Sequence, residues 1–154
     1  MAYAAVRVRG IINIKPDIKK TLELLNLTRA NHCVIIDESK TTKGMLQVVK
    51  DYITWGEVDN KTIKNLISKR GRITGDKEVT DSLIKSSTSY ANIEKLSDAI
   101  AKDKFKYKEI PDIKPIFRLN PPKKGYEGIK RSFKNKGALG YRGKEINKLI
   151  EKMI

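Results

Sequence analysis

A glycine- and proline-rich segment near the C-terminus places the strongest restriction on the fold of this chain. Residues 120–142 contain the pair Pro121-Pro122 and four glycines. Proline removes a backbone donor and disrupts helices, and glycine has a low propensity for helix interiors. We therefore expect neither a regular helix nor a central strand here. The segment should lie on the surface as a mobile loop, disordered in the free protein and ordered only on binding a partner.

The same segment is strongly basic and carries aromatic residues between its cations. Seven basic side chains stand there against one acid, Glu127. Cations release counterions from phosphates, and exposed rings stack on unpaired bases, so this composition predicts an RNA-binding surface. The alternative is a solvated, partly disordered loop without a partner. The predicted RNA contacts in this segment are Lys123, Lys124, Tyr126, Lys130, Arg131, Lys134, Lys136, Tyr141 and Arg142.

The net charge of the chain is unevenly distributed. Lys and Arg number 33 against 18 Asp and Glu, a net charge of +15. Residues 113–154 hold twelve basic and three acidic side chains, and so supply +9 of that total. Such a concentration favours one face that meets nucleic acid. No uncharged run is long enough for a membrane span and no signal-peptide pattern is present, so a cytoplasmic location without a membrane partner is expected.

The chain offers little reactive chemistry. It has one cysteine, Cys33, and one histidine, His32, which excludes an internal disulfide and a Cys/His zinc site. The two are neighbours in a predicted strand and point to opposite faces, so Cys33 is interpreted as a core residue. The acidic pair Asp37-Glu38 could hold a metal, but turn and cap roles are favoured. Phosphate-binding and nucleophile motifs are missing. We expect no catalytic residue, metal, cofactor or small-molecule substrate.

Hydrophobic periodicity predicts an alternation of strands and helices. The expected elements are a strand at 2–10, a helix at 16–26, a strand at 33–36, a helix from Thr41 or Thr42 through Ile53, short helices capped by Asp59, Thr80 and Asn92, a strand at 116–119 and a terminal helix containing 146–153. A doubly wound parallel sheet is compatible with this order. An α+β fold suits so short a core better.

We therefore predict a ferredoxin-like α+β core with a small antiparallel sheet and two helices on one face. The other sheet face, from which Arg7 and Arg9 would emerge, should be open to a partner. The predicted parts are a core at 1–58 and 113–121, a helical insertion at 59–112, a basic RNA-binding loop at 122–143 and a C-terminal helix at 144–154.

Six further cations are candidate RNA contacts outside the basic loop. They are Arg7, Arg9, Arg29, Lys69, Arg70 and Arg72. Ordinary salt bridges on an exposed face are the alternative for the first three, and a solvated basic turn for the last three.

Several runs of residues resemble a known family. They are Val-Arg-Val-Arg-Gly at 6–10, Tyr-Ile-Thr-Trp-Gly-Glu at 52–57, Phe-Arg-Leu-Asn-Pro-Pro at 117–122 and Leu-Gly-Tyr-Arg-Gly-Lys-Glu-Ile-Asn-Lys-Leu-Ile at 139–150. In order and spacing they are similar to the archaeal form of the family of large-subunit ribosomal protein thirty, the counterpart of eukaryotic large-subunit protein seven.

The resemblance implies a ferredoxin-like core and a structural, non-enzymatic place in the large (50S) ribosomal subunit. It also implies contacts with 23S ribosomal RNA, with 5S ribosomal RNA and with neighbouring ribosomal proteins. The alternatives are a free-standing nucleic-acid-binding regulator and a basic accessory subunit of an RNA-processing enzyme.

Overall fold

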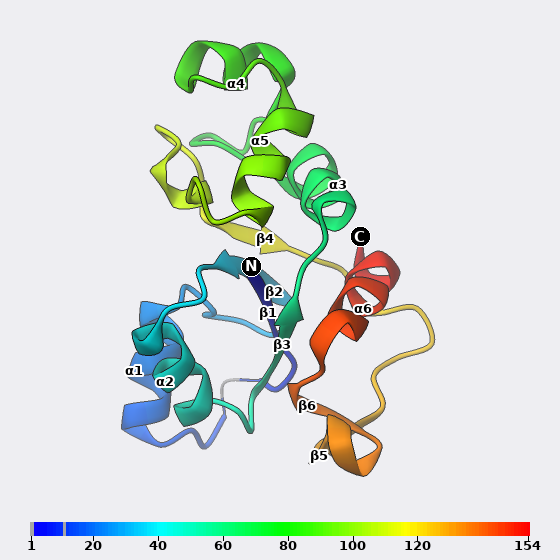
Figure 1. Cartoon of the computed structure of the whole chain (residues 1–154). Helices are drawn as coiled ribbons and strands as arrows, with labels where there is room; N and C mark the ends of the chain where they lie inside the picture. The colour runs from blue at the N-terminus through cyan, green and yellow to red at the C-terminus, as the bar shows by residue number, and fades with distance from the viewer. Residues whose placement is uncertain (1, 11) are drawn as a thin grey trace.

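The computed structural model describes residues 2–10 and 12–154, and its elements alternate as expected for an α+β chain (Figure 1). The strands are β1 (Tyr3–Arg7), β2 (His32–Ile36), β3 (Ile53–Glu57), β4 (Ile116–Arg118), β5 (Gly128–Ser132) and β6 (Gly137–Tyr141). The helices are α1 (Pro16–Leu24), α2 (Lys40–Val48), α3 (Asn60–Arg70), α4 (Asp81–Ser87), α5 (Ile93–Ala101) and α6 (Ile146–Met153). Three short 3-10 turns are η1 (Tyr107–Glu109), η2 (Phe133–Asn135) and η3 (Gly143–Glu145). The predicted fold class is confirmed.

The strands form one mixed sheet in the order β4-β2-β1-β3-β6-β5. The part from β4 to β3 is antiparallel, with Ala5 opposite Val34 on one side and Trp55 on the other. The last two pairings, β3 with β6 and β6 with β5, are parallel. β4 and β5 are therefore the two edges of the sheet.

Helices α1 and α2 cover one face of the sheet, as predicted. Pro16 occupies the first turn of α1, where its missing N–H costs nothing. Ser39 caps α2, its Oγ accepting from the Thr42 backbone N–H at 3.1 Å. Leucines of both helices pack against Tyr3, Ala5, Val34, Ile53 and Trp55. The buried leucines Leu22 and Leu46 each contribute about 1.5–3 kcal/mol by leaving water.

The predicted helix through Ile53 is wrong in its last turns. α2 ends at Val48, a turn follows in which the Tyr52 N–H donates to the Val49 carbonyl, and Ile53 begins β3. Apart from exposed Val48, the apolar residues from Met45 to Ile53 therefore come from a helix, a turn and the start of a strand, and all of them pack against the same core.

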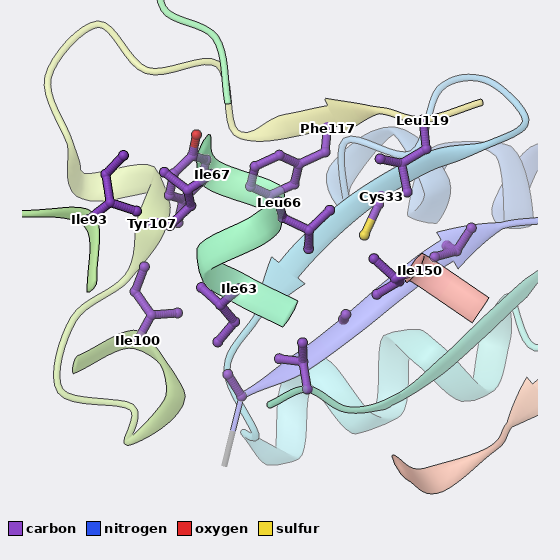
Figure 2. Packing of buried hydrophobic residues seen from close by; sticks show 14 of the residues in the cluster. Cys33, Ile63, Leu66, Ile67, Ile93, Ile100, Tyr107, Phe117, Leu119 and Ile150 are labelled. Atoms are coloured by element: carbon purple, nitrogen blue, oxygen red, sulfur yellow. The ribbon is translucent and has the colours of Figure 1, made fainter. Parts of the chain in front are cut away.

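The second face of the sheet is closed, which corrects the prediction of an open face. Ala4, Val6 and Cys33 form one hydrophobic cluster with α3, α5 and α6, whose buried residues include Ile63 and Ile150 (Figure 2). The ring of Phe117 on β4 stacks on Tyr107 at 4.9 Å between centroids. Because the side chains of this face are apolar, the face is stable only when it is covered. Residues 59–112 provide most of that cover.

The short helices of 59–112 begin where capping residues predicted them. Thr80 Oγ1 accepts from the Leu83 N–H at 3.3 Å, and Asn92 Oδ1 accepts from the Lys95 N–H at 2.9 Å. Asp59 precedes α3 without a side-chain cap bond. Its backbone N–H donates instead to Asn147 on α6 at 2.9 Å. None of the helices in residues 2–10 and 12–154 is long and apolar enough to cross a membrane.

From Gly128 onward the glycine-rich segment is regular structure, contrary to expectation. It forms β5, η2 and β6, and β6 lies between β3 and β5 in the sheet. Ala138 and Leu139 of β6 are buried against Val8. Gly137 is required for packing, since a Cβ there would lie 2.0 Å from the Arg131 carbonyl oxygen. Gly137, one of the glycines that predicted a loose loop, instead permits β5 and β6 to approach closely.

Candidate nucleic-acid interface

The edge formed by β5 and η2 displays four cations to solvent. Lys130 and Arg131 lie on β5, Lys134 on η2, and Lys136 at the left-handed position that ends η2, with φ 61°. All four are exposed. We name them the β5-edge cations. No acidic residue occurs between Gly128 and Arg142, so nothing in this segment neutralises them.

Arg142, predicted to contact RNA from an exposed loop, is buried and has protein partners. Its Nε donates to Thr54 Oγ1 at 2.8 Å and its Nη2 to the Ala138 carbonyl at 2.9 Å. Its guanidinium lies 4.9 Å from the centre of the Phe133 ring. Burial lowers the pKa of Arg142, and the nearby Glu127 carboxylate opposes that shift. Arg142 fastens β6 to β3 and is not available to a phosphate.

The two candidate tyrosines differ in availability. Tyr126 is half-buried and its hydroxyl donates to Asn31 Oδ1 at 2.6 Å; burial raises the pKa of this phenol. Tyr141 is 44% exposed and its hydroxyl donates to Glu57, which raises its pKa to about 12. The Tyr141 ring contacts Trp55 at 6.3 Å between centroids. Only Tyr141 presents enough ring surface to stack on a base.

Arg7 is also buried, so the prediction that it lies on an exposed face is wrong. Its guanidinium donates to the carbonyls of Leu27, Arg9 and Gly10 at 2.7, 2.9 and 3.0 Å. β1 ends at Arg7, and the chain segments around it turn their carbonyls inward. Arg7 thus satisfies backbone acceptors at the strand end. Arg9 is partly exposed over the Tyr52 ring at 5.1 Å, and Arg29 is exposed.

Lys69, Arg70 and Arg72 do not form the single basic turn that the sequence predicts. Lys69 and Arg70 close α3, and Arg72 pairs with Glu78 across an antiparallel bridge. Arg72 Nη1 donates to the Gly71 carbonyl at 2.8 Å. Exposed Lys69 and Lys123 line one hollow, although they are far apart in sequence.

Two cations near Arg70 and Arg72 were not predicted as contacts. Lys114 and Arg118 line a shared hollow with them. In sequence they stand alone between apolar residues, and only the pairing of β4 into the sheet brings them there. Lys124, also a candidate, is exposed in the turn after β4.

Reactive groups are not assembled in the part of the chain that the structure describes. No group of His, Cys, Asp and Glu there could hold a metal ion. Cys33 is buried, as predicted, and burial raises the pKa of its thiol. Burial lowers the pKa of His32, and the cations of Arg118 and Arg29 add to that shift.

Comparison with known proteins finds similarity over the whole chain. A family model described as Ribosomal protein L30p/L7e matches residues 3–53. The large ribosomal subunit protein uL30 of Methanosphaera stadtmanae is 53% identical over 152 residues, which cover 99% of both chains. The protein of that name from Methanococcus maripaludis is 47% identical over the full length of both chains. That from Thermoplasma volcanium is 48% identical over 98% of this chain and 92% of its own. The similarity therefore includes the insertion and the β5–β6 segment.

Proposed function

We propose that this chain, which belongs to the ribosomal protein L30p/L7e family, is a structural constituent of the large ribosomal subunit that binds ribosomal RNA. The observation that carries the proposal is the identity of 53% with a large-subunit protein, which extends over 99% of both chains. The resemblance predicted from the sequence is confirmed. The proposed role is structural and takes place in the cytoplasm, within the ribosome, without a catalytic step.

The RNA-binding surface that we propose centres on the β5-edge cations. Two exposed cations on the edge strand β5 and two at the η2 turn that follows it face solvent, and their backbone is already folded, so contact with backbone phosphates requires no ordering of a loop. Exposed Tyr141 supplies a ring for stacking. Further proposed contacts are Arg9, Arg29, Lys69, Arg70, Arg72, Lys123 and Lys124. Arg7, Tyr126 and Arg142 are assigned to the scaffold because their polar groups already have partners within the chain.

The proposed partners are 23S ribosomal RNA, 5S ribosomal RNA and neighbouring large-subunit proteins. Phosphate contacts give affinity that falls with salt. Four such contacts predict a loss of about 50- to 150-fold in the association constant between 50 and 200 mM salt, from a slope of about −0.7 to −0.9 per contact.

Incorporation into ribosomes tests the proposal. Wild-type protein, added to cells as a tagged copy, should sediment with large subunits in a sucrose gradient. A variant with Lys130, Arg131, Lys134 and Lys136 all changed to Gln should appear at the top of the gradient. The matched control changes four exposed lysines on the α1 and α2 side of the sheet to Gln. These are Lys19, Lys20, Lys40 and Lys50.

The outcomes separate the alternatives. Equal sedimentation of both quadruple variants would refute the β5-edge contacts while leaving the subunit assignment standing. Wild-type protein that never sediments with large subunits, but binds short duplexes with sequence preference, would identify a free-standing regulator. Cleavage of labelled RNA in the presence of divalent metals would favour an accessory subunit of an RNA-processing enzyme.

A further inference from the structure

Four cations from two separate chain segments line one hollow at the β4 edge of the sheet. Arg70 ends α3, Arg72 follows in the bridge to Glu78, Lys114 precedes β4 and Arg118 is the last residue of β4. The hollow has a volume of about 180 Å³ and is also lined by Asp76 and Ile116. We name it the β4-edge basin. Residues more than forty positions apart meet there, so the basin is a product of the tertiary fold.

The charge of the basin is far from balanced. Four cationic side chains face one carboxylate among the lining residues, that of Asp76. Lys114 Nζ contacts Asp76 Oδ1, and Arg118 Nη1 lies 4.0 Å from the same oxygen. Arg72 has a second acidic neighbour in Glu78, at 3.8 Å. The hydrogen bond from Lys114 is the main reason that the pKa of Asp76 is lowered, so the carboxylate is charged at neutral pH.

A tight turn holds Asp76 at the basin. Gly75 and Asp76 both have positive φ, at 89° and 58°. The Asp76 N–H donates to the Ile73 carbonyl at 3.0 Å, and the Thr74 N–H donates to the Asp112 carbonyl at 2.9 Å. The backbone thus fixes the position of a carboxylate that is itself 63% exposed. An exposed ion pair is weak, so its partner can be exchanged at little cost.

We propose that the β4-edge basin binds a backbone phosphate of RNA, and that Asp76 is its internal counter-ion, which the phosphate displaces. This inference rests on the proposed function and assigns it a second site. An RNA phosphodiester carries one negative charge on two non-bridging oxygens, as a carboxylate does, and guanidinium groups bind phosphate in a bidentate manner. Once Asp76 is displaced, four cationic side chains line the basin, of which Arg72 also lies near Glu78, and the phosphate takes the place of the Asp76 carboxylate.

The basin and the β5-edge cations contact different phosphates in this proposal. β4 and β5 are the opposite edges of the six-stranded sheet. Five strand spacings separate them, about 24 Å at about 4.8 Å each. The effects of substitutions at the two edges should therefore be independent of one another.

Removal of the counter-ion tests the proposal. Asp76→Asn keeps the shape of the side chain, and asparagine accepts the left-handed backbone at this position. Binding of full-length protein to transcribed large-subunit ribosomal RNA is measured by filter retention at 100 mM salt. We expect Asp76→Asn to bind about three- to fivefold more tightly, because no carboxylate competes for Lys114 and Arg118. Glu23→Gln on α1 makes the same charge change at an exposed site on the other side of the sheet and is the control.

A second substitution locates the effect. Lys114→Gln alone should change the affinity for RNA less than twofold. In wild-type protein Lys114 must give up its ion pair with Asp76 before it can contact the phosphate, so its net contribution is small. In the Asp76→Asn background the same change should cancel the gain and reduce the salt slope by about one. Unfolding temperatures of all variants establish that each is folded.

Four results would overturn the inference. The first is an affinity of Asp76→Asn that equals that of the Glu23→Gln control, and the second is a gain that survives Lys114→Gln. In both cases wild-type protein still binds RNA, so the proposed function stands. The third is an Asp76→Asn variant that binds polyglutamate more tightly than wild-type protein does, but binds RNA no more tightly. That result would assign the basin to an acidic polypeptide. Failure of the wild-type protein to bind the RNA at all would remove both proposals.

Discussion

Arg142 should be the polar side chain on which the β5–β6 segment depends, and Arg142→Gln tests this. The side chain is 6% exposed and donates two hydrogen bonds, to Thr54 Oγ1 at 2.8 Å and to the Ala138 carbonyl at 2.9 Å. Charge-assisted hydrogen bonds contribute about 1.5–3 kcal/mol each, and the contact with the Phe133 ring adds about 1 kcal/mol. Glutamine is shorter and neutral, and retains at most one bond of about 1 kcal/mol.

These terms give a loss of roughly 3–6 kcal/mol, and we expect a loss of unfolding free energy of roughly 3–5 kcal/mol, since this is the range found when one partner of a buried charged network is removed. For a chain of this length each kcal/mol lowers the melting temperature by about 2–4 °C, so the midpoint should fall by about 6–20 °C. Urea denaturation followed by circular dichroism measures the free energy directly. Lys134→Gln, an exposed change in the same segment, should lie within about 0.5 kcal/mol of wild type.

Hydrogen exchange distinguishes this interpretation from a disordered loop. The Arg142 N–H donates to the Trp55 carbonyl at 2.9 Å, so it should be strongly protected in the free protein. An Arg142→Gln variant as stable as Lys134→Gln, or rapid exchange of the Arg142 amide in wild type, would refute the argument.

Three other substitutions or titrations follow from the packing and the charges. Gly56→Ala should destabilise the protein by at least about 2 kcal/mol, because the added Cβ would lie 1.9 Å from the Gly143 carbonyl oxygen; a melting curve like that of wild type would contradict this. Phe117→Ala should cost about 3–5 kcal/mol in urea denaturation, since the ring is fully buried; a loss below about 1 kcal/mol would mean that the core collapses around the cavity. The pKa of Glu38, measured by NMR, should be about 2, because the Lys43 ammonium hydrogen-bonds the Glu38 carboxylate. The stability that this carboxylate contributes is present above the ordinary pKa of 4.5 and is lost as the pH falls through about 2. Lys43→Gln should return the pKa of Glu38 toward 4.5.

Local patterns predicted most of the elements correctly. Alternation identified β1, the apolar run gave β2, and Thr80 and Asn92 cap helices where expected. These features depend on neighbours within a few residues, and such interactions are visible in a linear sequence. Cys33 lies in the core because it belongs to a short apolar strand.

The errors concern contacts between distant residues. β6 is a strand because Thr54 and Trp55 of β3 pair with Gly140 and Tyr141, and Gly137 permits the close approach of β5 on its other side. Local propensity alone predicts a loop from the same glycines. Arg7 and Arg142 looked like surface cations, because no local signal distinguishes an arginine that donates to buried carbonyls from one that faces water.

The sequence by itself determined the family, the α+β class and the excess of positive charge at the C-terminal end, since these depend on composition and on the order of short patterns. The tertiary structure alone decided which cations are available. It buried Arg7 and Arg142, left the β5-edge cations outside, and assembled the β4-edge basin from residues inside the insertion and residues that follow it. The physical reason is that the exposure of a long charged side chain depends on which backbone carbonyls and carboxylates the fold brings within its reach, and those groups come from elsewhere in the chain.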